Sequence, residues 1–192
     1  MKTIPQFILA SASPRRLQLL KQAGIVPDDI IAADIDENPH KTELPQHYVL
    51  RMAQEKARAV EAQRPDAVVL AADTVVAAGS RILPKAEDEK TARKCLELLS
   101  GRRHRVYTAV CVRHGEKIQQ VTEMTQVRFA RLSKQQIEAY LASGEWQGKA
   151  GGYAIQGLAE IFIPWINGSY SNVVGLPLER TCAMLVRMGV KA

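Results

Sequence analysis

Short apolar runs that alternate with helical segments constrain the fold of this chain more than any other feature. Three runs have the length of buried strands and cover residues 6–10, 30–33 and 67–72. The remaining predicted elements are strands at 105–113, 119–131 and 160–166 and helices at 46–63, 88–99, 133–141 and 177–188. This alternation, with hairpins inserted and no linker or repeat, predicts a mixed-sheet α/β fold in a single domain over residues 1–192.

The composition is that of an ordinary globular chain and favours an anionic partner. The 192 residues are 46% hydrophobic, and 26 Lys and Arg against 20 Asp and Glu give a formal charge of +6. Basic residues are spread along the chain and aromatic residues make up 5%, so nucleic acid is not an expected partner. The three cysteines form no CxxC pair, and no apolar stretch reaches ~20 residues. These features predict no membrane partner and a cytoplasmic location.

Two arginines follow the first predicted strand, in a tight turn that opens a helix. Ser13 is a good N-cap, Pro14 suits the first helical position and Gly24 suits the stop. Arg15 and Arg16 then fall in the first helical turn, where positive charge opposes the helix dipole. A bound anion would remove that cost, because free backbone N–H groups, serine hydroxyls and guanidinium groups all bind phosphate oxygens. The alternative is that both arginines extend into water.

Acidic residues that follow predicted strands are candidates for a metal or water site. Asp73 comes at the end of a predicted buried strand, where open α/β sheets place ligands, and it could hold a metal or activate water. A turn or helix-cap role for Asp73 is disfavoured, because Val75 and Val76 follow and no helix is predicted to begin there. Glu37 lies beside Asp36 in an acidic loop after another short strand. This pair could bind a hard cation, or it could be solvated loop charge.

Lysines and a glycine-rich segment are the other candidates. Lys56 lies on the apolar face of the helix 46–63, where it either reaches a ligand or extends past the core edge to water. Lys85 follows a predicted hairpin, and this position alone predicts that it lies on the surface. The segment 144–152 resembles a phosphate-binding loop but lacks the Walker A spacing, and Ala150 stands where Ser or Thr would bind the metal.

A series of motifs runs from one end of the chain to the other. They are LASASPRR at 9–16, DIDE at 34–37, RMAQEKA at 51–57, AADTVV at 71–76, LSGRRHRVYTAV at 99–110, GEWQGKAGGYAIQG at 144–157 and NGSYSNVVGLPL at 167–178. In this order they resemble the Maf family of nucleotide pyrophosphatases. The resemblance implies a single Maf-like domain related to the inosine-triphosphate pyrophosphatases, with two lobes around a central cleft, and usually a homodimer.

The same resemblance implies an activity and the residues that carry it. A Maf-type enzyme cleaves the α–β phosphoanhydride of a nucleoside triphosphate to give the monophosphate and diphosphate, with Mg²⁺ or Mn²⁺. Asp73 matches the catalytic aspartate, which activates water and binds the metal together with Glu37. The residues that match the family's phosphate contacts are Lys56, Lys85, Ser11, Arg15 and Arg16.

The resemblance also implies a preferred base. Arg15, Thr74 and Gln156 resemble the dTTP/UTP branch, and the Gln156 amide can donate and accept as the O4/N3 edge of thymine or uracil requires. One departure concerns Lys85, which is followed by Ala86 where the family commonly has proline. Two alternatives remain open at this point. One is a pyrophosphatase of broad or modified-nucleotide preference, for example for 7-methyl-GTP, and the other is a non-enzymatic module that binds nucleic acid or a cell-division protein.

Overall fold

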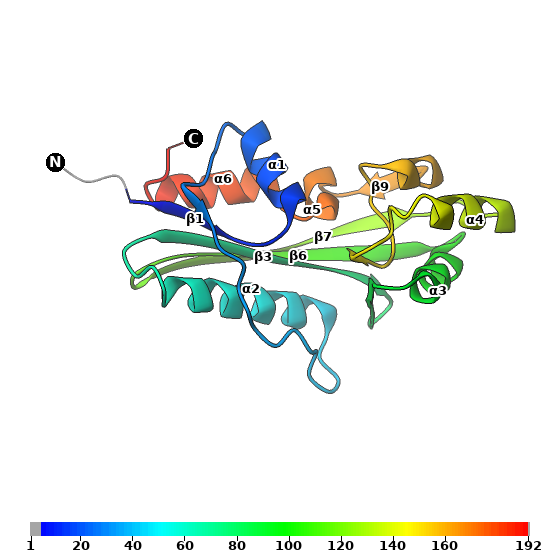
Figure 1. Cartoon of the computed structure of the whole chain (residues 1–192), viewed down its shortest axis with the longest axis horizontal. Helices are drawn as coiled ribbons and strands as arrows, with labels where there is room; N and C mark the ends of the chain where they lie inside the picture. Colours follow the sequence, from blue (N-terminus) through cyan, green and yellow to red (C-terminus); the bar gives the residue numbers. More distant parts are fainter. Residues whose placement is uncertain (1–4, 192) are drawn as a thin grey trace.

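A mixed sheet forms the centre of the protein in a computed structural model, which describes residues 5–191 (Figure 1). The strands are β1 (Phe7–Ala10), β2 (Asp29–Ile30), β3 (Val68–Ala78), β4 (Arg81–Leu83), β5 (Lys85–Ala86), β6 (Arg103–His114), β7 (Lys117–Arg128), β8 (Lys149–Ala150) and β9 (Trp165–Asn167). Within the described residues the main sheet has the order β2-β1-β3-β6-β7-β9, with β4 paired to β3. β1 is parallel to both of its neighbours, whereas the pairs from β3 to β9 are antiparallel. A separate antiparallel ribbon joins β5 to β8.

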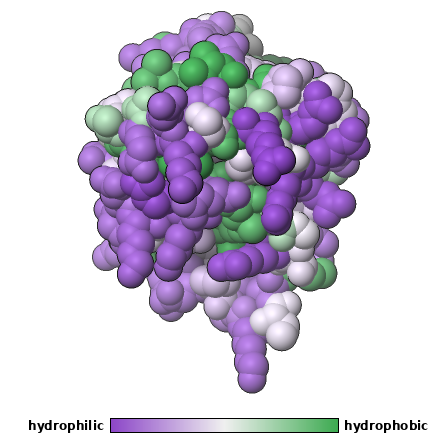
Figure 2. Space-filling model, turned by 90° about the vertical axis from the view of Figure 1, so that its right-hand side faces the viewer, coloured by the Kyte–Doolittle hydropathy of each residue, from purple (hydrophilic) through white to green (hydrophobic). Residues whose placement is uncertain are grey.

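Helices cover both faces of the sheet and one of its ends (Figure 1). The helices are α1 (Pro14–Gln22), α2 (Pro45–Glu61), α3 (Glu89–Leu99), α4 (Lys134–Ala142), α5 (Tyr170–Val174), α6 (Leu178–Arg187) and the 3₁₀ helix η1 (Leu158–Phe162). α2 packs on one face, and α1, α5 and α6 lie on the other. α3 and α4 pack against each other at the end seen in Figure 2, where most of the surface is hydrophilic. Between residues 5 and 191, no helix is long and apolar enough to cross a membrane.

The core divides between the two faces of the sheet and the end under α3 and α4. Along β3, Val69 and Ala71 pack with the residues of α2, whereas Val68 and Leu70 pack with those of α1 and α6, as strand alternation requires. A third cluster lies under α3 and α4 and forms a second lobe. Its largest fully buried members are Leu96, Leu99 and Phe129. The mixed α/β fold expected from the sequence is confirmed.

Two of the predicted helix ends are built as the sequence indicates. α1 starts at Pro14 and ends just before Gly24, whose φ of 74° suits glycine. α4 begins with the expected capping box, in which the Ser133 hydroxyl accepts from the Gln136 amide and the Gln136 side chain accepts from the Ser133 amide. Ser13 occupies the N-cap position of α1, but its side chain makes no capping hydrogen bond there.

Three sequence-based expectations for strands are wrong. β3 continues to Ala78 because its residues pair one by one with β6 from Val69 to Ala77, so Asp73 lies inside the strand and not at its end. In the predicted strand 160–166, residues 160–162 belong to η1, and β9 starts only at Trp165, after Pro164 interrupts the backbone hydrogen bonding. The predicted strand 30–33 shortens to the two residues of β2.

Candidate active site

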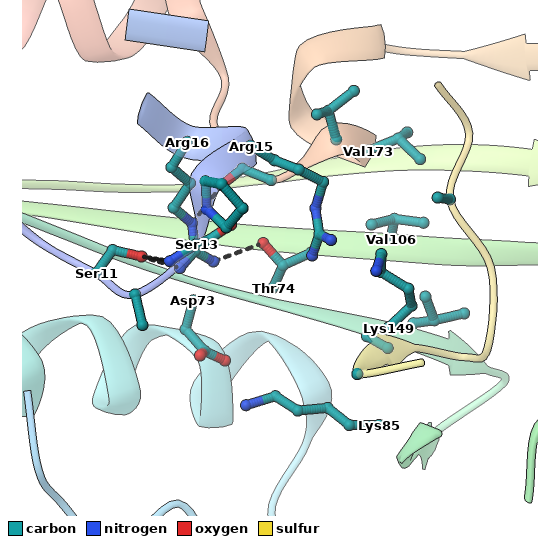
Figure 3. A pocket seen from close by; sticks show the side chains of 18 of the residues that line it. Ser11, Ser13, Arg15, Arg16, Asp73, Thr74, Lys85, Val106, Lys149 and Val173 are labelled. Atoms are coloured by element: carbon teal, nitrogen blue, oxygen red, sulfur yellow. Dashed lines mark hydrogen bonds between the residues drawn. The ribbon is translucent and has the colours of Figure 1, made fainter. Parts of the chain in front are cut away.

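A cavity of about 350 Å³ lies at a gap beside β3 (Figure 3). β3 pairs with β1 only as far as Ala71 and with β4 only from Val76. The strand edge between these positions is uncovered, so side chains from both faces of β3 reach the same cavity. Asp73 enters from the α2 face and Thr74 from the opposite face. The other walls are the β1–α1 turn, the β5–β8 ribbon and the segments around Tyr153 and Val173.

Four charged side chains, Glu37, Lys56, Asp73 and Lys85, form an acid–lysine cluster on one side of the cavity. Lys56 Nζ lies 2.7 Å from Asp73 Oδ1 and 2.7 Å from Glu37 Oε1, and Lys85 Nζ lies 2.5 Å from Glu37 Oε2. Lys56 and Asp73 are buried, with 8% and 5% of their surface exposed. Lys56 therefore does not extend into water, and its burial is compatible with its charge because two carboxylates surround it.

The loop before α2 carries Glu37 into the cavity. Tyr48, near the start of α2, donates from its hydroxyl to the Glu37 backbone carbonyl at 2.7 Å. Burial acts to raise the pKa of Glu37, but the hydrogen bonds and charges of Lys56 and Lys85 outweigh it and lower this pKa to about 2. Glu37 is therefore ionised at neutral pH. Asp36 is exposed and accepts from the backbone and side-chain amides of Asn38, so it does not join Glu37 in the cavity.

The β1–α1 turn brings both arginines to the cavity but uses them differently. Arg16 is held in place by three acceptors: the Gly175 carbonyl at 2.9 Å, the Ser11 hydroxyl at 3.1 Å and the Thr74 hydroxyl at 3.2 Å. The Ser11 hydroxyl also accepts from the Ser13 amide at 3.2 Å. Ser11, Thr74 and Arg16 thus fix the shape of the turn, and the start of α1 borders the cavity.

Among residues 5–191, Arg15 and Gln156 are the predicted site residues whose side chains have no hydrogen-bond or ion-pair partner. Arg15 points into the cavity, and no hydrogen bond or ion pair holds its guanidinium among residues 5–191. Burial lowers the pKa of Arg15, which reflects the cost of placing its charge away from water. Gln156 lines the cavity with an exposed side chain. All nine predicted site residues thus border one cavity, and these two are free to meet a ligand.

Side chains that the residue pattern did not single out shape the rest of the cavity. Tyr153 is a wall residue, and its hydroxyl lies 2.8 Å from Nε2 of His104, which is 49 positions away in the sequence. Phe129 packs edge-on against both rings. Burial lowers the pKa of His104 to about 4, so its ring is neutral at pH 7. Lys149 is a further wall residue, from the segment that fails as a Walker A loop.

The two carboxylates of the acid–lysine cluster fit a small divalent cation. Glu37 and Asp73 both direct an oxygen at the Lys56 ammonium group, which shows that they converge on one positive charge. Across residues 5–191, no group of three or more His, Cys, Asp or Glu side chains could hold a metal. A pair of carboxylates suits Mg²⁺, which is commonly held by one or two carboxylates together with waters and phosphate oxygens.

Comparison with known proteins places the chain in a family. A dTTP/UTP pyrophosphatase of Novosphingobium aromaticivorans is 56% identical over 187 residues, which cover 97% of this chain and 93% of that protein. One of Gluconobacter oxydans is 58% identical over 188 residues, which cover 94% and 86%. The solved structure of the Staphylococcus aureus Ham1 protein aligns with 72% of this chain and 97% of that chain, at 14% identity and a TM-score of 0.43. A family model described as Maf-like protein matches residues 6–188, and the chain belongs to this family.

Proposed function

We propose that this chain is a nucleoside triphosphate pyrophosphatase that prefers dTTP and UTP. It takes a nucleoside triphosphate and water to the nucleoside monophosphate and diphosphate by cleaving the α–β phosphoanhydride bond. The observation that carries the proposal is the acid–lysine cluster, in which two carboxylates and two ammonium groups meet beside an arginine-bearing turn. Relatives at 56% and 58% identity that bear the name dTTP/UTP pyrophosphatase support it.

The charged side chains have roles suited to a polyphosphate, because phosphoryl transfer depends on charge stabilisation more than on covalent chemistry. Asp73 accepts the proton of the attacking water, and the hydrogen bond from Lys56 holds the Asp73 side chain in position. Lys85 and the N–H groups at the start of α1 contact the phosphate oxygens, and Arg15, which points into the cavity, is a further contact for the nucleotide. Arg16 keeps the turn in the shape that presents those groups.

Mg²⁺ or Mn²⁺ is the proposed cofactor, with Glu37 and Asp73 as its protein ligands. When bound, a divalent cation neutralises phosphate charge and lowers the pKa of coordinated water. The two carboxylates then share their charge between the metal and the lysines. Lys56 and Lys85 are left with donors to offer to the phosphates, since an ammonium group has three N–H bonds. The family-typical arrangement as a homodimer is part of the same proposal.

Gln156 is proposed to read the base. The residues that line the cavity also include Val106, Val173 and Tyr153, whose side chains suit a planar ring. An amide side chain both donates and accepts, as the O4 and N3–H groups of uracil and thymine require. Exposed Gln156 side-chain groups are available for this pair of hydrogen bonds.

Diphosphate release by the purified protein tests the proposal. The panel contains dTTP, UTP, CTP, GTP and 7-methyl-GTP, each with Mg²⁺ or Mn²⁺. Release chiefly from dTTP and UTP is expected. Release chiefly from another nucleotide would retain the chemistry and overturn the assignment of Gln156. Folded protein that releases diphosphate from none of them would overturn the enzyme proposal, and steeply salt-dependent binding to nucleic acid would then favour a binding module.

A further inference from the structure

A third lysine, Lys149, borders the cavity from the other face of the β5–β8 ribbon. In the ribbon Lys85 is paired with Ala150, and Ala86 with Lys149. Directly paired residues share a face and successive residues alternate, so Lys85 and Lys149 project to opposite faces. Lys85 reaches the acid–lysine cluster, whereas Lys149 lies near Val106 and Arg15 (Figure 3).

The backbone on either side of Lys149 is fixed. The Gly148 amide donates to the Ala86 carbonyl at 2.8 Å, and the Gly151 amide donates to the Pro84 carbonyl at 3.0 Å. Gly151 has a φ of 65°, and a Cβ built there would lie 2.8 Å from Cβ of Val76. Only glycine therefore allows β8 to sit this close to β3, and Lys149 is carried on a rigid support at the cavity wall.

The charge of Lys149 is not balanced by a carboxylate. Its ammonium group donates to the Gln147 carbonyl at 2.9 Å, and no ion pair to it occurs among residues 5–191. Glu145 acts on Lys149 only at longer range, because its carboxylate is bonded to the Tyr140 hydroxyl and the Leu158 amide. Burial and the charge of Arg15 lower the pKa of Lys149. Two of its three N–H donors therefore remain for a ligand.

From this placement we infer that Lys149 donates a hydrogen bond to the O4 carbonyl oxygen of the uracil or thymine ring and so selects dTTP and UTP. The inference rests on the proposed function and adds a specificity residue to it. The phosphates and the metal belong with the acid–lysine cluster, on the other face of the ribbon. Near Lys149 the cavity wall includes the apolar side chains of Val106 and Val173, which suit a planar ring.

The same contact rejects cytosine. A carbonyl oxygen has two lone pairs, so O4 accepts from Lys149 and from the Gln156 amide together. Cytosine carries an amino group in place of O4, and its N–H donors would face an ammonium group that has no lone pair to accept them. An unpaired donor next to a partly buried charge disfavours binding. Lys149 therefore lowers the affinity for CTP as well as raising the affinity for UTP.

The test compares Lys149→Met with the wild type on dTTP, UTP and CTP. We expect kcat/KM for dTTP and UTP to fall about 10- to 100-fold, the cost of losing a hydrogen bond from a charged donor, while kcat/KM for CTP stays level or rises. Lys94→Met is the matched control, since Lys94 is exposed on α3, and it should behave as the wild type. Should Lys149→Met fail to fold by circular dichroism, Lys149→Gln replaces it. For Lys149→Gln we also expect a smaller difference in kcat/KM between UTP and CTP, because a neutral amide can donate to O4 or accept from the cytosine amino group.

Other outcomes overturn the inference. A fall of similar size for all three nucleotides would mean that Lys149 contacts phosphate or ribose, and no change for any would mean that it is a solvated wall residue. If the wild type cleaves none of the nucleotides, the proposed function fails, and calorimetric binding of UMP and CMP then tests Lys149 by itself. Loss of UMP affinity in Lys149→Met without loss of CMP affinity would still support the base contact, and equal affinities would refute it.

Discussion

The β5–β8 ribbon separates two halves of the cavity. The charged side chains are paired with one another in one half and have no ion-pair partner in the other. In the half that faces Lys85, each ammonium group of the acid–lysine cluster meets a carboxylate within 2.7 Å. In the other half, Arg15 and Lys149 have no carboxylate partner among residues 5–191. The paired half is balanced without a ligand, so a ligand there must exchange partners. The unpaired half gains its first counter-charge or acceptor from the ligand, so it contributes more net binding.

This difference suggests a division of labour between chemistry and recognition. Exchangeable ion pairs suit phosphates and a metal, which bring their own charge and must leave again after cleavage. Hydrogen-bond donors beside apolar walls suit a base, which must be held in one orientation. Substitutions in the paired half are therefore expected to change turnover, whereas substitutions in the other half change the choice of nucleotide.

Asp73→Asn breaks the paired half most severely. We expect kcat with dTTP to fall about 100- to 10,000-fold, because the amide cannot accept the proton of the attacking water. The fold should persist, since Lys56 keeps its ion pair with Glu37. Diphosphate release and circular dichroism measure the two effects. Asp66→Asn, an exposed aspartate just before β3, is the control, and near-normal turnover in Asp73→Asn would contradict the role given to this residue.

Glu37→Gln tests the metal in the same half. The concentration of Mg²⁺ needed for half-maximal activity is expected to rise at least about 10- to 100-fold, because one of two charged ligands is lost. Asp36→Asn is the matched control, since this neighbour turns away to Asn38 and should leave the metal requirement unchanged. An equal effect of the two substitutions would show that the acidic loop acts through its overall charge and not through Glu37.

Lys85→Met should produce a smaller effect within the cluster. The Lys85 side chain is 50% exposed and has a single partner, so water screens its contribution. We expect KM for dTTP to rise about two- to fivefold with little change in kcat, and Lys85→Arg to restore the wild-type value. A loss of kcat as large as that of Asp73→Asn would instead place Lys85 at the reacting bond.

Much of this arrangement was predictable from the sequence where local signals are strong. Pro14 and Gly24 marked α1, and the Ser133–Gln136 capping box marked α4. The pattern alone made Arg15, Arg16, Asp73 and Glu37 candidates, whereas Thr74 and Gln156 followed only from the family resemblance. By pattern alone, Lys56 looked like a residue at the core edge, because nothing local shows that two carboxylates from distant segments will surround it.

The features that the sequence did not predict have separate physical causes. Asp73 looked like the end of a strand because a carboxylate is unfavourable in a buried strand, but nine pairings with β6 and the ion pair with Lys56 override that local preference. Helix α5 was overlooked although Ser169 caps it and Gly175 ends it, because five residues are too few to show a helical period. Lys149 has no local signal of its own, because its glycine-rich segment resembles a Walker A loop without the spacing of one.

His104 supports the wall of the unpaired half through Tyr153, and its substitution is expected to change stability more than turnover. Its pKa of about 4 in the fold lies below its ordinary value of 6.5, so the unfolded chain binds more protons between these pH values. Stability from the neutral ring is complete above pH 6.5 and is lost as the pH falls to 4, by about 3 kcal/mol at most. His104→Gln keeps a polar group for the Tyr153 hydroxyl but does not titrate. Denaturant unfolding at pH 7 and pH 4 measures the loss of stability between these pH values. The loss should be smaller in His104→Gln than in the wild type or in the exposed control His47→Gln. Equal losses in all three proteins would mean that His104 is protonated within the fold.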